Sequence, residues 1–289
     1  MRYQAALRPD CGYSNRWPLL ILRWVNFFAH TIASMSAESN PLPWLMPGDP
    51  FPDVACAWGP ESDAPGLLAA GGELSVETLK RAYGSAIFPW FSKGQPVLWW
   101  SPNPRMVLQV SHFRLHRSLR KTLQRFRDDV RCEVRFDTAF ERVIAACSKP
   151  QRKGQSGTWI VPPMVYAYTQ LHAAGLAHSV ETWVDGELVG GLYCVALGRA
   201  VFGESMFTRI PDASKIALSA LISFCRTHSI EMIDCQQNTT HLASLGAAEM
   251  PRDVFVRHVH AAMQVSIPSW TFSPVNWNHI FDCESPPCD

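Results

Sequence analysis

Hydrophobic and polar residues of this chain follow two different periods. Between His178 and Phe207, apolar and polar positions largely alternate, as they do in half-buried β-strands. Asp185-Gly186 and Gly198-Arg199 interrupt the alternation with residues that are typical of tight hairpin turns. The pattern predicts an antiparallel meander of three strands, over 178–184, 187–197 and 200–207.

Helical spacing dominates on either side of the meander. Ser75 is a favourable N-cap for a helix that ends near Tyr83. Pro162-Pro163 can open a helix that Gly175 closes. We expect further helices over 136–147, from Asp212 or Ser214 to about His228, over 239–245 and over 252–263. A short strand over 231–236 should lie between the helix that ends near His228 and the helix over 239–245.

The segment between Phe51 and Arg105 has a different character, because aromatic residues there stand beside proline and glycine. Such segments favour extended backbone and turns over helices. We predict an N-terminal extension over 1–50, a small domain over 51–111, a larger domain over 112–266 and a tail over 267–289. Met35 precedes a polar, proline-rich stretch, so we expect residues 1–34 to be an upstream extension.

Composition narrows the class of protein. The 289 residues are 47% hydrophobic and carry a formal net charge of +1, which predicts a folded core and excludes a uniformly basic nucleic-acid binder. The nine cysteines are odd in number and lack zinc-ligand spacing, so we expect free thiols in the cytoplasm and no metal. The apolar run Leu19 to Ala33 is interrupted and too short to span a membrane.

The stretch from His112 to Arg135 concentrates positive charge. Leucines and a phenylalanine recur there at helical spacing, which leaves a cationic opposite face. That face is either an ordinary solvated helix surface or a contact surface for a phosphate backbone. The candidate phosphate contacts are Arg117, Arg120, Lys121, Arg125 and Arg127.

The order of the expected elements is the layout of the GNAT acyltransferase superfamily, which makes the fold class α+β. GNAT enzymes that use acetyl-coenzyme A have a glycine-rich pyrophosphate loop between the meander and the next helix. The corresponding segment here, Thr208 to Lys215, contains no glycine. We therefore expect an acyl donor other than coenzyme A.

Three polar residues interrupt otherwise apolar strands. Asp234 and Gln236 are two apart on the expected strand 231–236, so they should share one face. Glu204 and Met206 are likewise two apart, next to Gly203. Each set has a structural interpretation too: Asp234 as a cap for the following loop, and Glu204 as a salt-bridged residue in a bulge.

Eight segments in register give the chain a specific resemblance. It closely resembles the bacterial leucyl/phenylalanyl-tRNA–protein transferases from about Pro65 to Met263. The segments that carry the resemblance are Gly71-Gly72-Glu73-Leu74, Ile87-Phe88-Pro89-Trp90-Phe91, Trp99-Trp100-Ser101-Pro102, Gly157-Thr158-Trp159-Ile160, His178-Ser179-Val180-Glu181, Gly203-Glu204-Ser205-Met206-Phe207, Ile233-Asp234-Cys235-Gln236 and Ala243-Ser244-Leu245-Gly246-Ala247.

The resemblance implies a small N-terminal domain, a GNAT-like C-terminal domain and a reaction. The family transfers Leu, Phe and less readily Met from aminoacyl-tRNA to proteins that begin with Arg or Lys, marking them for the N-degron pathway. It further implies that Trp90 and Trp159 stack on the 3′-terminal adenosine, with Phe88 nearby. The basic stretch from Arg117 to Arg127 corresponds to the family's tRNA-binding surface.

By the same resemblance, Met206, Leu192 and Val201 line the pocket for the donor side chain. Leu192 and Val201 differ in size or shape from the residues of better-known members, so the resemblance does not extend to the preference between Leu and Phe. Glu204 contacts the aminoacyl end or the acceptor, and Asp234 with Gln236 forms the reacting centre.

Because the aminoacyl ester is already activated, the reaction requires no cofactor. We also expect the protein to be a monomer. Asp234 acts either as a general base or by electrostatic placement. The alternatives are a GNAT-type transferase with another acceptor, such as a small-molecule N-acetyltransferase or a Fem-type enzyme, and a non-catalytic RNA-binding protein.

Overall fold

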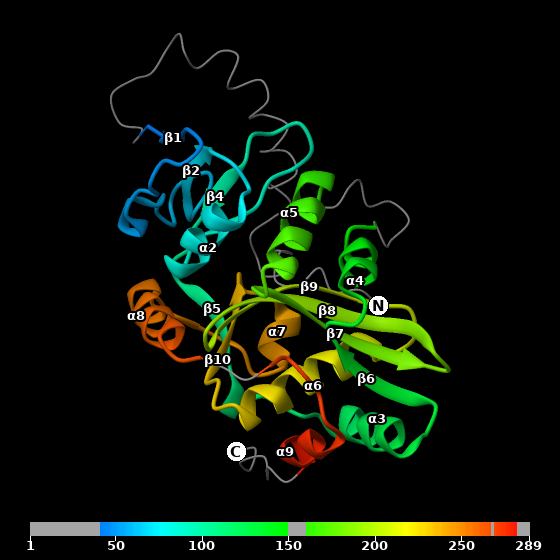
Figure 1. The fold of residues 1–289 in the computed structure, drawn as a ribbon. Coiled ribbons are helices and arrows are strands. Elements are labelled where there is room, and N and C mark those ends of the chain that lie inside the picture. The colour runs from blue at the N-terminus through cyan, green and yellow to red at the C-terminus, as the bar shows by residue number, and fades with distance from the viewer. Residues whose placement is uncertain (1–40, 150–159, 267–268, 282–289) are drawn as a thin grey trace.

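The protein folds around two β-sheets. The computed structural model describes residues 41–149, 160–266 and 269–281 (Figure 1). The predictions for the extension 1–34 and for Trp159 fall outside these ranges. The described part is a mixed α and β structure in which a small N-terminal sheet lies beside a larger C-terminal one.

The N-terminal sheet has four short strands in the order β1-β2-β4-β3, and one helix follows β2. Ser75 caps this helix as predicted, since its side chain accepts a hydrogen bond from the backbone N–H of Thr78. The elements are β1 (Trp44–Leu45), η1 (Val54–Cys56), β2 (Leu67–Gly71), α2 (Val76–Gly84), β3 (Phe88–Pro89) and β4 (Leu98–Trp100).

The larger sheet has seven strands in the order β11-β5-β10-β9-β8-β7-β6. The predicted meander is confirmed as β7, β8 and β9, which pair antiparallel. The strands are β5 (Arg105–Gln109), β6 (Cys132–Phe136), β7 (Ala177–Val184), β8 (Glu187–Leu197), β9 (Ala200–Thr208), β10 (Met232–Gln236) and β11 (Ala248–Met250). Although β5 lies within the range predicted for the small domain, it pairs with β10 and β11.

Most helices begin and end at or near the residues that the capping pattern predicted. One expectation was wrong: the helix predicted over 136–147 starts only at Phe140, because Phe136 pairs with Val180 in the β6–β7 ladder. The helical elements that follow β5 are η2 (Val110–His112), α3 (Arg117–Asp128), α4 (Phe140–Cys147), α5 (Pro162–Ala173), α6 (Ala213–Thr227), α7 (Thr240–Ser244), α8 (Arg252–Met263), η3 (Pro274–Trp277) and α9 (Asn278–Phe281).

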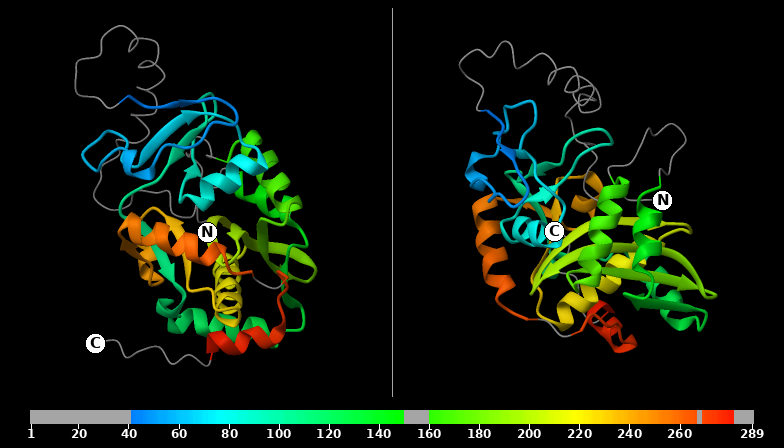
Figure 2. Two further views of the ribbon diagram at one scale, coloured as in Figure 1. Left: turned by 60° about the vertical axis from the view of Figure 1, so that its left-hand side comes forward. Right: turned by 45° about the horizontal axis from the view of Figure 1, so that its top comes forward.

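The larger sheet lies between two layers of helices (Figure 2). A separate hydrophobic core lies on each of its faces. One core joins α4, α5 and α8 to the N-terminal sheet, so that Trp99 and Tyr168 belong to the same buried cluster. The other lies between the opposite face and α3, α6 and the segment that contains α9. Because the first core is continuous across both sheets, side chains of the N-terminal part reach the strands of the larger sheet. Among the described helices, none has the length and apolar character that crossing a bilayer requires.

Candidate active site

The candidate site lies where two parallel strands of the larger sheet diverge. β9 and β10 pair only through Ile233 with Val201 and Asp234 with Phe202. Beyond this point β9 continues to Thr208, whereas β10 ends at Gln236, which has a positive φ of 61°. The edge of β9 that follows Phe202 therefore has no ladder partner on that side, and backbone and side chains there are open to other interactions.

A β-bulge aims Glu204 into this region. Tyr193 pairs with Ser205 and Cys194 with Gly203, so Glu204 is the extra residue on β9. A bulge changes the phase of the side chains that follow it. The prediction that Glu204 and Met206 share a face is therefore wrong: Glu204 meets side chains from α2 and α5, while Met206 packs in the core on the α6 side.

Glu204 is buried among hydrogen-bond donors from three different elements. Its carboxyl oxygens accept hydrogen bonds from Tyr83 Oη at 2.6 Å, Tyr168 Oη at 3.3 Å and Gln236 Nε2 at 3.2 Å. The pKa of Glu204 is raised to about 8, chiefly by burial; the nearby Asp234 contributes to the rise, and the tyrosines and Arg105 oppose it. The site thus contains a carboxyl group that can change protonation near neutral pH.

Burial also keeps both tyrosines protonated. The pKa of Tyr83 and that of Tyr168 are raised well above the usual value, first by loss of hydration and then by the neighbouring Glu204. The two hydroxyls also hydrogen-bond to one another, so each shares its single hydrogen between that partner and Glu204. The cluster is a connected chain of proton donors and acceptors that joins α2 and α5 to β9.

Asp234 and Gln236 lie together as predicted. The backbone N–H of Gln236 donates to Asp234 Oδ1 at 2.9 Å, and its side-chain amide donates to the carbonyl of Gly203 at 3.0 Å. The amide group therefore bridges the gap between the diverging strands. Arg105, at the start of β5, binds both carboxylate oxygens of Asp234, at 2.8 and 2.7 Å.

The residues predicted to line the donor side-chain pocket are neighbours. Leu192 on β8 is the register partner of Met206 on β9, and both are buried. They pack in the second core with Val201 and Ile233, next to the point where β9 and β10 separate. An apolar side chain would find aliphatic neighbours here, on the opposite face of β9 from Glu204.

The aromatic residues predicted for adenosine binding flank the N-terminal side of the site. Trp90 is half-buried, with its ring centroid 5.2 Å from that of Trp100. Phe88 is buried, and its ring faces the guanidinium of Arg105 at 4.8 Å. Phe88 thus packs against the arginine that binds Asp234. Trp159 lies outside the described residues.

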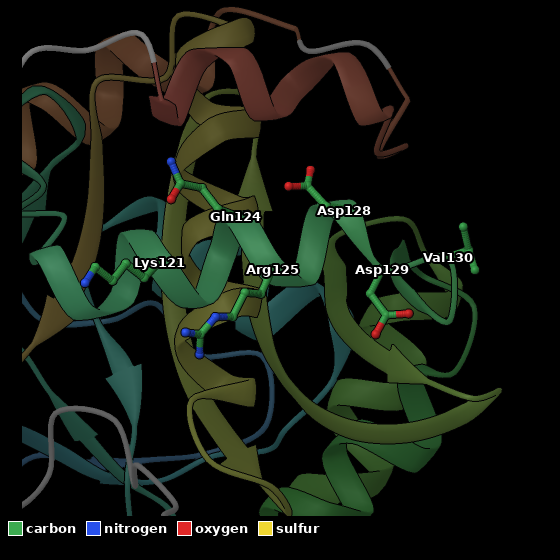
Figure 3. Close-up of a pocket in the computed structure, with 6 residues that line it drawn as sticks. All are labelled: Lys121, Gln124, Arg125, Asp128, Asp129 and Val130. Atoms are coloured by element: carbon green, nitrogen blue, oxygen red, sulfur yellow. The ribbon is translucent and has the colours of Figure 1, made fainter.

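The predicted phosphate-contacting residues lie on α3, away from the buried cluster. Arg117, Lys121 and Arg125 are exposed, and the last two border a surface hollow with Gln124 and the two aspartates Asp128 and Asp129 (Figure 3). Arg120 and Arg127 are partly engaged within the protein. Arg120 donates to the carbonyl of Phe281, and Arg127 stacks on the Phe281 ring and binds Asp128.

Sequence reasoning missed three residues of the buried cluster. Tyr83 and Tyr168 resemble ordinary core positions on amphipathic helices, and nothing local marks them as partners of Glu204. Arg105 stands inside a proline-rich turn region, where an arginine is expected to be solvated. A signal did exist for Asp234, because a buried carboxylate requires a cationic or hydrogen-bonding partner.

The described residues contain no group of His, Cys, Asp and Glu side chains arranged to hold a metal ion. The donors and acceptors of the buried cluster are instead satisfied by one another. The arrangement can orient an ester or amine beside a hydrogen-bonding chain.

Comparison with known proteins identifies the family. The family model described as Leucyl/phenylalanyl-tRNA protein transferase matches residues 107–260. The model of the N-terminal domain of the same family matches residues 72–103.

Three curated relatives, from Polaromonas sp., Albidiferax ferrireducens and Leptothrix cholodnii, each bear the name leucyl/phenylalanyl-tRNA–protein transferase. The Polaromonas protein is 63% identical over 252 residues, which is 87% of this chain and 99% of the relative. The Albidiferax protein is 61% identical over 87% of this chain and 99% of its own length. The Leptothrix protein is 58% identical over 83% of this chain and 96% of its own length. The chain therefore belongs to the leucyl/phenylalanyl-tRNA protein transferase family.

Proposed function

We propose that this protein transfers leucine or phenylalanine, and less readily methionine, from aminoacyl-tRNA to the N-terminal arginine or lysine of acceptor proteins. Support comes from the names of the relatives and from the family models that match both parts of the chain. The modified proteins enter the N-degron pathway in the cytoplasm, and the enzyme acts as a monomer. No cofactor is required, since the donor ester is already activated.

The fold supports an acyl-transfer site of the GNAT type. A seven-stranded sheet has an antiparallel meander, and one parallel pair, β9 and β10, separates after two register pairs. We infer that the aminoacyl ester binds where β9 and β10 separate, beside the part of β9 that β10 does not pair. This geometry suits an aminoacyl ester, whose reacting carbonyl stands between an apolar side chain and a nucleotide.

The bond changes are those of ester aminolysis. The α-amine of the acceptor attacks the ester carbonyl, a peptide C–N bond forms, and the ester C–O bond breaks. The ribose hydroxyl leaves with the bonding electron pair and gains a proton, while the amine loses one. Since the α-amine has a pKa of about 8, a large share of it is already neutral near physiological pH.

Positioning is therefore the enzyme's main task, and Asp234 contributes to it electrostatically. Both of its carboxylate oxygens already accept hydrogen bonds from Arg105, and Oδ1 also accepts one from Gln236. Both oxygens of this carboxylate are therefore engaged within the protein. Of the two roles open for Asp234, this arrangement favours orientation of Gln236 and of the amine over general-base catalysis.

The tRNA is held at a distance from the reacting centre. Arg117, Lys121 and Arg125 on α3 are proposed to contact its phosphates, with smaller contributions from Arg120 and Arg127. Trp90 and Trp159 are proposed to stack on the terminal adenosine, and Leu192 and Met206 to receive the donor side chain. Such a division separates affinity, which is electrostatic and salt-dependent, from chemistry in a buried cluster.

The observation that carries the proposal is the buried cluster of Glu204, Gln236 and Asp234 at the divergence of β9 and β10. The test is transfer of radiolabelled leucine from Leu-tRNA to a model protein with N-terminal arginine. We expect label in the protein fraction, and none when alanine replaces the N-terminal arginine. Binding of Leu-tRNA without incorporation would contradict the proposal and favour an RNA-binding protein.

A further inference from the structure

Arg105 occupies a position between the two sheets that its sequence context does not suggest. It is the first residue of β5, and its side chain is completely buried. Besides its two hydrogen bonds to Asp234, it donates from Nη1 to the backbone carbonyl of Ala86 at 3.2 Å. One guanidinium group therefore holds both the carboxylate of the candidate site and the turn that precedes β3.

Two aromatic rings enclose the same guanidinium. Its central carbon lies 4.8 Å from the centroid of the Phe88 ring and 4.9 Å from that of Phe255 on α8. Phe88 is two residues before Trp90, for which we propose adenosine stacking. The rings exclude water and fix the plane of the guanidinium, so its donors point to set positions.

The buried pair transmits this fixed geometry to the reacting centre. Arg105 holds both oxygens of Asp234, Asp234 Oδ1 accepts the backbone N–H of Gln236, and the Gln236 amide reaches Glu204. Each step is a direct hydrogen bond between buried groups. The chain of contacts runs without interruption from the Ala86–Phe88 turn to the gap between β9 and β10.

We propose that Arg105 is a positioning residue for aminoacyl transfer, which keeps the Ala86–Trp90 segment in register with Asp234 and Gln236. The inference rests on the proposed function, because the register matters only if this segment binds the donor end and β10 serves the reaction. Arg105 itself acts through Asp234. Lysine would keep the charge at this position but offers no planar group that can span two carboxylate oxygens and a carbonyl.

A second arginine provides a matched control. Arg252 on α8 also crosses between the two sheets, where its Nη1 donates to the carbonyl of Ser101 and its backbone N–H to Asn103. It lies in the same junction, and the interactions described for it involve neither Asp234 nor the Ala86–Phe88 turn. If arginines at the junction serve stability alone, replacing either should have the same consequences.

The first experiment compares Arg105→Lys, Arg252→Lys, Asp234→Asn and the double variant Arg105→Lys with Asp234→Asn. We expect Arg105→Lys to lower the kcat of leucine transfer by about 10- to 100-fold, with the KM for Leu-tRNA within about 3-fold of the wild-type value. In the Asp234→Asn background the same change should cost less than about 3-fold, because the effect passes through Asp234. Arg252→Lys should leave kcat within about 2-fold.

The second experiment is independent of activity. Amide hydrogen exchange should accelerate in both 86–90 and 232–236 of Arg105→Lys, and in neither segment of Arg252→Lys. An equal loss of kcat in both backgrounds, an unchanged kcat, or exchange that changes in only one segment would each overturn the inference. A wild-type protein that transfers no leucine would refute the proposed function instead, while the exchange data would still decide whether Arg105 links the two segments.

Discussion

Two buried glutamates in the larger sheet receive their hydrogen bonds from different sets of elements. Glu181 on β7 accepts hydrogen bonds from Ala139 N–H, Thr138, Ser179 and Trp183. These donors belong to β7 itself and to the start of α4, so the carboxylate joins one strand to the helix beside it. Glu204 on β9 instead draws its donors from three separate elements, α2, α5 and β10.

The difference shows that burial of a carboxyl group does not by itself mark a reacting centre. Glu181 is satisfied by donors from its own strand and from the residues just before α4, and its strand is paired on both sides, with β6 and β8, so its arrangement is explained by stability alone. Glu204 lies at a bulge on β9, just beyond the last register pair of β9 with β10, and burial raises its pKa to about 8. A polar group whose partners converge from separate elements, at a break in the sheet, is the better candidate for function.

The largest expected effect on stability lies at Glu181. Glu181→Gln replaces one acceptor oxygen by a donor that faces existing donors, so we expect the free energy of unfolding to fall by about 2–4 kcal/mol. Urea denaturation measures this change. The kcat of the folded variant should match the wild-type value, whereas Glu204→Gln should lower kcat by about 10-fold or more. Equal losses of activity in the two variants would contradict the comparison.

The pH dependence of stability should next test the raised pKa of Glu204. Because the folded-state pKa of Glu204 is about 8 and its ordinary value is 4.5, the folded protein holds one more proton than the unfolded chain between these pH values. Its contribution to stability is therefore lost as pH rises through this window, by up to about 1.4 kcal/mol per pH unit. Urea unfolding curves at intervals from pH 5 to 8 should show that Glu204→Gln removes this slope. Parallel curves for variant and wild type would show that Glu204 is already ionised.

The smallest effects belong to the exposed charges of α3. Lys121→Ala and Arg125→Ala should each weaken Leu-tRNA binding by about 1 kcal/mol or less and reduce the slope of log affinity against log salt by about 1. Arg127→Ala is the matched control on the same helix, since Arg127 already interacts with Asp128 and Phe281. Filter binding at several salt concentrations gives the slopes. Slopes for Lys121→Ala and Arg125→Ala that equal the wild-type slope would place the tRNA on another surface.

Local patterns predicted the elements of the fold well. The turns Asp185-Gly186 and Gly198-Arg199 divide the meander as the sequence indicated, and Ser75 caps its helix. Each of these features is determined within a few residues, by backbone conformation or by capping. Asp234 and Gln236 were likewise placed together correctly, since both belong to one short strand.

Features that depend on contacts between distant residues could not be predicted from local sequence patterns. No residue of β5 signals that it pairs with β10 and β11, because strand pairing depends on distant partners. A single extra residue at Glu204 shifted the side chains after it, so strict alternation placed Met206 on the wrong face. The contacts of Tyr83 and Tyr168 with Glu204, and of Arg105 with Asp234, join elements that are far apart in the sequence. Such contacts form only when the whole chain folds, so no local pattern indicates them.

The central claim is that the buried cluster at the divergence of β9 and β10 performs the chemistry while α3 holds the tRNA. The most direct measurement is single-turnover leucine transfer by wild type and Asp234→Asn, with Leu-tRNA affinity determined on the same folded samples. We predict a loss of transfer rate of about 100-fold with affinity within about 3-fold. Transfer by Asp234→Asn at the wild-type rate would contradict the claim.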